Sequence, residues 1–157
     1  MNFDTWNESA ESAVNTIFSL VRPQARVSLQ SLRKGLDDFI ASLFDRPAGN
    51  TRAVAWFSNI GADAIELVVS LDLDLTSKTV VKTLVKKQRD YGPENIARFG
   101  RKGLLVRLHD KVARLENLAA RGATPENEAV VDTYLDIIGY CAIGIMWETN
   151  QFLLPLE

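Results

Sequence analysis

The chain has 157 residues, of which 46% are hydrophobic and 24% charged, values that fit one globular domain and argue against a disordered or fibrous protein. Its formal charge of −2 is unevenly spread, because residues 78–121 contain 12 Lys or Arg and four Asp or Glu, a balance of +8 that leaves −10 elsewhere. The acidic amino terminus is unlike a signal peptide, and the longest apolar run, residues 137–147, is about half the roughly 20 residues that cross a bilayer.

Three helices are predicted in the amino-terminal half, where apolar residues recur at steps of three and four. Their expected ranges are about 4–20, 26–44 and 51–71. Pro23 breaks the first pattern, and the segment 46–50, with its proline and glycine, ends the second. Residues 72–76 alternate too briefly to form a strand, so we interpret them as a linker.

In the carboxy-terminal half, the sequence predicts three helices and a short turn. A helix capped by Thr76 or Ser77 should end at 90–93, followed by a turn at 94–99. A fifth helix is expected at about 102–120, and a last one from Thr124 to about Glu148, with Pro125 in its first position. The predicted fold is an all-α bundle of about six helices in one domain, 1–157, with residues 1–75 as an amino-terminal extension and 76–150 as the core.

The last predicted helix carries an unusual acidic stripe. Glu128, Asp132 and Asp136 are four residues apart and share one face, yet residues 126–157 contain no Lys or Arg that could pair with them. Like charges at this spacing repel, so partners from outside the helix are expected. One candidate is Mg²⁺, which prefers oxygen ligands. Another is the basic face of the fifth helix, and a purely structural network of salt bridges would use the same residues.

The segment between the fourth and fifth helices has features of a phosphate-binding loop. Lys87, Asp90, Tyr91 and Asn95 surround a helix end, and glycines flank the basic pair at 101–102. Cationic side chains bind phosphate, and a tyrosine offers a flat apolar face with a polar tip. A simple helix terminator would account for the Tyr-Gly-Pro turn equally well.

Three blocks of sequence, in this order, resemble a phage and bacterial family of nucleotide-modification-associated domains. The blocks are Lys87-x-x-Asp90-Tyr91-Gly92, then Arg107-x-x-Asp110-Lys111-x-x-Arg114-Leu115-x-Asn117-Leu118, then Glu128-x-x-x-Asp132-Thr133-x-x-Asp136-x-x-x-Tyr140. They span about residues 78–147, roughly half of the chain. That family is in turn similar to the all-α nucleoside triphosphate pyrophosphohydrolases of the MazG and dimeric dUTPase type.

This resemblance implies a MazG-like carboxy-terminal half with a Mg²⁺-dependent nucleotide site, in which a metal-activated water attacks the phosphate chain between the α and β phosphates. The implied metal ligands are Asp110, Glu128, Asp132 and Asp136, with Asp110 and Asp132 as the catalytic pair. The implied phosphate-binding residues are Lys87, Arg107, Lys111 and Arg114, and the residues near base or sugar are Asp90, Tyr91 and Asn95.

The chain departs from the pyrophosphohydrolase pattern at one helix. MazG proteins pair Glu-x-x-Glu there with Glu-x-x-Asp on the next helix, whereas this chain offers only Asp110 among basic residues, and Glu116 points elsewhere. A nucleotide-binding or sequestering protein without catalysis is therefore an alternative, and a helical protein-interaction module is a third. The lone histidine, His109, fits a surface or salt-bridged imidazole better than a general base.

We further expect a cytoplasmic protein, in the host cytoplasm if a phage encodes it. Cys141 lies in an apolar run and should belong to the core, as a free thiol does in a reducing compartment. A dimer or larger homo-oligomer is predicted, with residues 137–147 as its contact surface. The acidic stripe and the sequence pI of about 5.5 argue against nucleic acid as the partner, and no membrane is expected.

Overall fold

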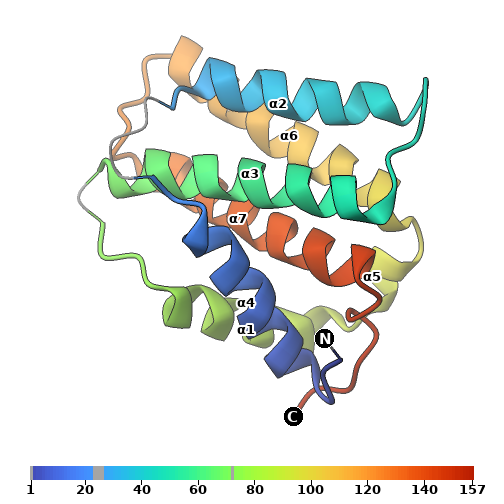
Figure 1. Ribbon diagram of the computed structural model, residues 1–157. Coiled ribbons are helices and arrows are strands. Elements are labelled where there is room, and N and C mark those ends of the chain that lie inside the picture. Colours follow the sequence, from blue (N-terminus) through green and yellow to red (C-terminus); the bar gives the residue numbers. More distant parts are fainter. Residues whose placement is uncertain (1, 23–26, 72) are drawn as a thin grey trace.

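A computed structural model describes residues 2–22, 27–71 and 73–157, and these ranges contain seven helices and no strand (Figure 1). The all-α class is thereby confirmed. The helices are α1 (Trp6–Ser19), α2 (Leu29–Ser42), α3 (Asn50–Val69), α4 (Ser77–Tyr91), α5 (Glu94–Ala97), α6 (Gly100–Ala120) and α7 (Glu128–Glu148). The turn expected at 94–99 thus contains the short α5.

Polar caps decide where several of these helices begin. The Thr76 hydroxyl accepts a hydrogen bond from the backbone N–H of Thr79 and starts α4, as expected. The start predicted for α7 is wrong, because the cap is the Asn127 side chain, which accepts from the N–H of Ala129 at 2.9 Å. Thr124 and its neighbours form a turn before it. The expectations for Pro23, Arg26 and Asp72 concern residues outside the described part of the chain.

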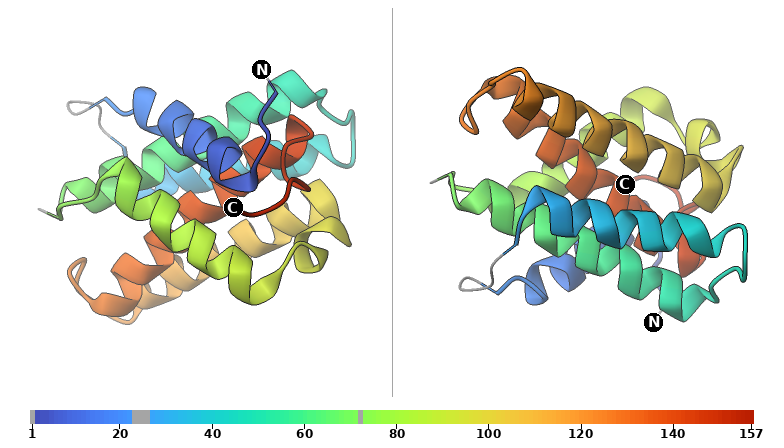
Figure 2. Two further views of the ribbon diagram at one scale, coloured as in Figure 1. Left: turned by 90° about the horizontal axis from the view of Figure 1, so that it is seen from below. Right: turned by 90° about the horizontal axis from the view of Figure 1, so that it is seen from above.

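Helix α7 lies at the centre of the bundle. In Figure 1, α3 and α7 lie between α2 and α6 above and α1 and α4 below. Helices α1, α3, α4 and α6 all contact α7, whereas α2 packs on α3 and α6 instead. The view from below in Figure 2 shows that α4 crosses α7 rather than running along it. Contact between α4 and α7 is therefore limited to the region of the crossing.

The composition of α7 suits this central position. Between Ile137 and Trp147 it carries no charged side chain, and a helix that is apolar on all sides must be buried. It is long and apolar enough to cross a membrane by length and composition, but 56% of its most apolar window is buried inside the protein, as in the core helix of a soluble protein. Cys141 is fully buried, which confirms its place in the core, and burial raises the pKa of its thiol.

The two halves of the chain share one hydrophobic cluster. Gly61 of α3 lets α1 and α7 approach closely, since a Cβ there would lie 3.0 Å from Ile17 and 3.1 Å from Cys141. Gly144 of α7 accommodates the ring of Phe57 from α3 in the same way. Helix α3, which belongs to the predicted extension, makes the most extensive contact with α7. The predicted boundary near residue 75 therefore does not separate two cores.

The two chain ends lie side by side (Figure 1). The backbone N–H of Trp6 donates to the carbonyl of Pro155 at 2.8 Å, and the Thr5 hydroxyl donates to Glu157 at 2.8 Å. Trp6 and Phe152 are both buried and meet edge to face, with ring centroids 6.1 Å apart. The carboxy-terminal segment thus closes the end of the bundle where α1 begins.

Candidate functional site

A cavity of about 370 Å³ lies where α4 crosses α7, with α5 and α6 forming its other walls. Its apolar walls include Leu84 of α4 and Leu135 and Ile143 of α7. Six of the residues predicted for the site line this cavity: Lys87, Tyr91, Asn95, Arg107, Lys111 and Asp136. They come from four different helices, so only the tertiary fold brings them together.

The carboxylate of Asp136 is held between two lysines. Lys87 of α4 donates to Oδ1 at 3.1 Å, and Lys111 of α6 lies 3.0 Å from Oδ2. The side chain of Asp136 is 25% exposed and that of Lys111 26%, whereas Lys87 is 51% exposed at the mouth of the cavity. Both carboxylate oxygens therefore already have a cationic partner.

Arg107 supplies a third cation that is not neutralised in this way. Its Nη2 donates to the backbone carbonyl of Asn95 at 3.4 Å, and its guanidinium lies 5.9 Å from the ring centroid of Tyr140. The Asn95 side-chain oxygen is buried and has no hydrogen-bond partner among the described residues. Three cations and one carboxylate leave the cavity lining with a formal excess of two positive charges.

Five other residues predicted for the site lie outside the cavity lining and are exposed: Asp90, Asp110, Arg114, Glu128 and Asp132. Geometry explains this difference for the acidic stripe. Asp132 and Glu128 are one and two turns before Asp136, which is about 6 and 12 Å along the helix axis. Because α4 crosses α7 near Asp136, it does not cover those earlier turns. Arg114 is likewise about 10 Å beyond Arg107 on α6.

The four predicted metal ligands do not converge. Within residues 2–22, 27–71 and 73–157, no three His, Cys, Asp or Glu side chains are grouped so that they could hold one ion. Asp136 is the only one of the four that lines the cavity, and two ammonium groups hold it. Mg²⁺ binding by these carboxylates stays a prediction.

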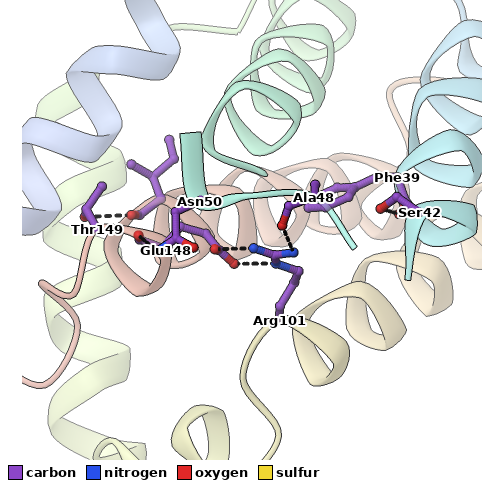
Figure 3. A network of polar contacts seen from close by, with 8 residues as sticks. Phe39, Ser42, Ala48, Asn50, Arg101, Glu148 and Thr149 are labelled. Atoms are coloured by element: carbon purple, nitrogen blue, oxygen red, sulfur yellow. Dashed lines mark hydrogen bonds and ion pairs between the residues drawn. The ribbon is translucent and has the colours of Figure 1, made fainter. Parts of the chain in front are cut away.

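The basic pair at 101–102 faces a different part of the molecule. Arg101 makes two hydrogen bonds to the buried carboxylate of Glu148, one of them at 2.7 Å, and a third to the carbonyl of Ala48 (Figure 3). Asn50 donates to the backbone carbonyl of Glu148 in the same network. The Glu148 carboxylate raises the pKa of Arg101. Arg101 therefore joins the end of α7 to the start of α3 and lies outside the lining of the candidate site.

His109 lies on the exposed side of α6, near the ion pair between Arg33 and Glu116. Arg33 of α2 contacts Nδ1 of His109 at 3.0 Å and binds Glu116 at 2.7 Å. The hydrogen bond from Arg33 lowers the pKa of the Glu116 carboxyl. His109 is exposed, which agrees with the surface alternative, and its contact with the Arg33 cation is not a salt bridge. Glu116 points away from the cavity because it binds Arg33 and so joins α6 to α2.

No protein-family model matches the chain, and no curated protein or solved structure matches it. The resemblance to nucleotide-modification-associated domains therefore stays an expectation.

Sequence reasoning missed four polar residues of the cavity as site residues: Thr79, Thr83, Gln88 and Tyr140. Tyr140 follows Asp136 by one helical turn, so the spacing that defined the acidic stripe also placed this ring on the same face. Gln88 is buried next to Lys87 and gave no such signal, because a glutamine within a basic run is typical of an exposed helix face.

Proposed function

We propose that the cavity binds a nucleotide, with the phosphate held by Lys87, Arg107 and Lys111. The observation that supports this proposal is the convergence of these three cations on one partly enclosed cavity with an excess of positive charge. Such a lining attracts anions, and guanidinium and ammonium groups bind phosphate oxygens through charge-assisted hydrogen bonds.

The remaining lining suits the nucleoside part of such a ligand. Tyr91 and Tyr140 offer flat rings, while Asn95 and Gln88 offer amide groups that can bond a base or sugar. The volume of about 370 Å³ lies within the range of small-molecule sites. Tyr91 is 69% exposed, so a base stacked on it would bury apolar surface that water now covers.

Nucleotide binding without hydrolysis is the version of the proposal that the geometry favours. Hydrolysis of the MazG type needs several carboxylates around a metal, and here only Asp136 lines the cavity. Mg²⁺ would then enter with the phosphates of a nucleoside triphosphate, because it commonly keeps waters and substrate oxygens as ligands. We extend the proposal to a role in phage or bacterial nucleotide metabolism in the cytoplasm, as the sequence resemblance implies.

A matched pair of variants tests the phosphate site. Lys87→Met removes a lining cation, whereas Lys86→Met removes its exposed neighbour outside the lining. We expect Lys87→Met to weaken binding of a nucleoside monophosphate by roughly tenfold in isothermal titration calorimetry, about 1.4 kcal/mol, and Lys86→Met to change it less than about twofold. Equal effects of the two substitutions would mean that only the overall charge matters, and the proposed site would be wrong.

A second experiment separates binding from hydrolysis. A panel of ribo- and deoxynucleoside triphosphates is incubated with the protein and Mg²⁺, and pyrophosphate release is measured alongside thermal stabilisation. We expect stabilisation without pyrophosphate. Release that is abolished by Asp132→Asn would favour the hydrolase instead, with the exposed part of the acidic stripe as its metal site.

A homo-oligomer needs a different contact surface from the one that the sequence predicts, residues 137–147. Most of residues 137–147 are buried within the single chain and have little surface left for a second copy. Large exposed apolar side chains lie elsewhere, among them Phe44 at 85%, Phe99 at 68% and Leu153 at 65%. Leu153 and Phe99 line one open hollow beside Trp147. An oligomer stays part of the proposal, with this hollow as the surface to examine.

A further inference from the structure

We propose that Asp136 is a built-in competitor for the ligand's phosphate, and that it restricts the cavity to ligands carrying about two negative charges. This inference rests on the proposed nucleotide function and concerns the same cavity. It assigns Asp136 a role other than metal ligand: the carboxylate occupies the cationic centre when no ligand is bound, and it sets how much negative charge the cavity accepts.

The contacts of Asp136 resemble those that a bound phosphate would make. One oxygen accepts a hydrogen bond from Lys87 at 3.1 Å, and the other forms an ion pair with the ammonium group of Lys111 at 3.0 Å. These two cations and Arg107 are the groups available to a phosphate in this cavity. A phosphate that approaches the lysines must therefore displace the carboxylate or share the lysines with it, and in either case the two anions repel each other.

Charge balance then defines the ligand class. The lining carries three positive groups and one negative group, so a dianion such as a nucleoside monophosphate neutralises it. A triphosphate without a metal brings more negative charge than the lining can balance. A bound Mg²⁺ ion adds two positive charges, so the complex has a net charge of about −2 and the balance is restored. The inference therefore predicts that Mg²⁺ helps a triphosphate by lowering its charge, without Asp136 as a ligand to the ion.

Asp136→Asn tests the inference, because the amide keeps the size of the side chain and removes its charge. Binding of a nucleoside monophosphate and of a triphosphate with and without Mg²⁺ is measured by calorimetry on the wild type and the variant. We expect the variant to bind the monophosphate about tenfold more tightly, and the metal-free triphosphate to gain at least as much. Glu94→Gln is the matched control, since it removes an exposed carboxylate next to Asn95 and outside the lining.

The outcomes separate this inference from the proposed function. Weaker or unchanged monophosphate binding by a folded Asp136→Asn protein, with Asp136→Ala as a second variant, would overturn the competitor role while leaving nucleotide binding intact. Loss of only the Mg²⁺-dependent gain for the triphosphate would make Asp136 a metal ligand and also overturn it. A similar gain in Glu94→Gln would show a general charge effect. If neither wild type nor variant binds a nucleotide or inorganic phosphate, the proposed function itself fails.

Discussion

At the scale of single residues, the most deeply buried ion pair in the described part of the chain joins Arg101 to Glu148. The Glu148 side chain is 4% exposed and that of Arg101 16%. Removing one partner of a buried pair leaves a charge without compensation, which costs far more than an exposed pair contributes. The pair also orders the segment from Ala48 to Asn50, because Arg101 donates to the carbonyl of Ala48 and the Asn50 side chain donates to the backbone carbonyl of Glu148 (Figure 3).

Arg101→Met should therefore destabilise the protein by roughly 3 kcal/mol, measured as a shift of the urea unfolding midpoint. Lys102→Met is the control, because this neighbour is exposed, and it should change stability by less than about 0.5 kcal/mol. The double variant Arg101→Met with Glu148→Met should recover much of the loss, since no unpaired charge remains. A single variant as stable as the control would show that the pair contributes little.

Asp63 on α3 makes stability depend on pH in an unusual direction. Burial, assisted by the charge of Glu66, raises the pKa of the Asp63 carboxyl from its ordinary 3.8 to about 6. Between about pH 4 and 6 the folded protein therefore binds this proton more tightly than the unfolded chain does. A rise in pH through that window then lowers the free energy of unfolding.

Asp63→Asn should remove this dependence. Asp63 is only partly buried, so solvent screens its charge and the effect should be modest. We expect the free energy of unfolding of the variant, measured relative to that of the wild type, to be about 1 kcal/mol higher at pH 7 than at pH 4. Unfolding free energies of both proteins at the two pH values provide the measurement. The Arg33–Glu116 pair acts in the opposite direction: because the pKa of Glu116 is lowered in the folded protein, the free energy of unfolding decreases as pH falls. This effect is the same in both proteins and cancels in the difference between them.

At the scale of elements, the crossing of α3 and α7 depends on the absence of a side chain at Gly144. A Cβ at this position would lie 2.6 Å from three ring atoms of Phe57, which is fully buried. Gly35 in α2 is the contrasting case, since a Cβ there meets nothing within 4 Å. The same substitution should therefore have opposite effects in the two helices.

We expect Gly144→Ala to destabilise the protein by about 1–3 kcal/mol, because overpacking exceeds the gain in helix propensity. Gly35→Ala should stabilise it by about 0.5–1 kcal/mol, since only the propensity term remains. Thermal unfolding of the two variants beside the wild type measures both. A stabilised Gly144→Ala protein would mean that Phe57 can move aside and that the helix crossing is looser than described.

The acidic stripe of α7 is accommodated by three different environments. Glu128 lies in the first turn, where the helix dipole favours negative charge. Asp132, one turn later, is exposed. Asp136 lies under α4 and beside α6 and takes two lysines. One helix face thus holds a charge at the helix start, an exposed charge and a charge in the cavity lining.

At the scale of the whole molecule, the central helix makes the two halves depend on each other. α7 is covered by α1 and α3 on one part of its surface and by α4 and α6 on another. A chain reduced to residues 76–157 would expose the apolar face that α1 and α3 now bury. We expect this fragment to lack a cooperative unfolding transition, which circular dichroism during heating would show. A fragment that unfolds cooperatively would instead establish an independent carboxy-terminal core.

Much of the fold followed from the sequence because the positions of helices are indicated by local sequence patterns. The spacing of apolar residues predicted the helices, and the capping hydroxyl of Thr76 placed the start of α4 correctly. The error at α7 has a local cause as well: Thr124 and Pro125 fit a helix start, but Asn127 competes with them and is the cap in the structure. Residues on one helix face, such as Arg107 with Lys111, were also grouped correctly.

The sequence by itself determined the all-α class, the faces of the helices and the absence of Lys and Arg from residues 126–157. Only the tertiary structure decided that Asp136, and neither Asp132 nor Glu128, meets Lys87 and Lys111. Helical periodicity specifies the direction in which a side chain points, but every turn of the stripe has the same periodicity. Where α4 crosses α7 depends on the packing of the seven helices that the structure describes, so the turn that lines the cavity has no signature of its own.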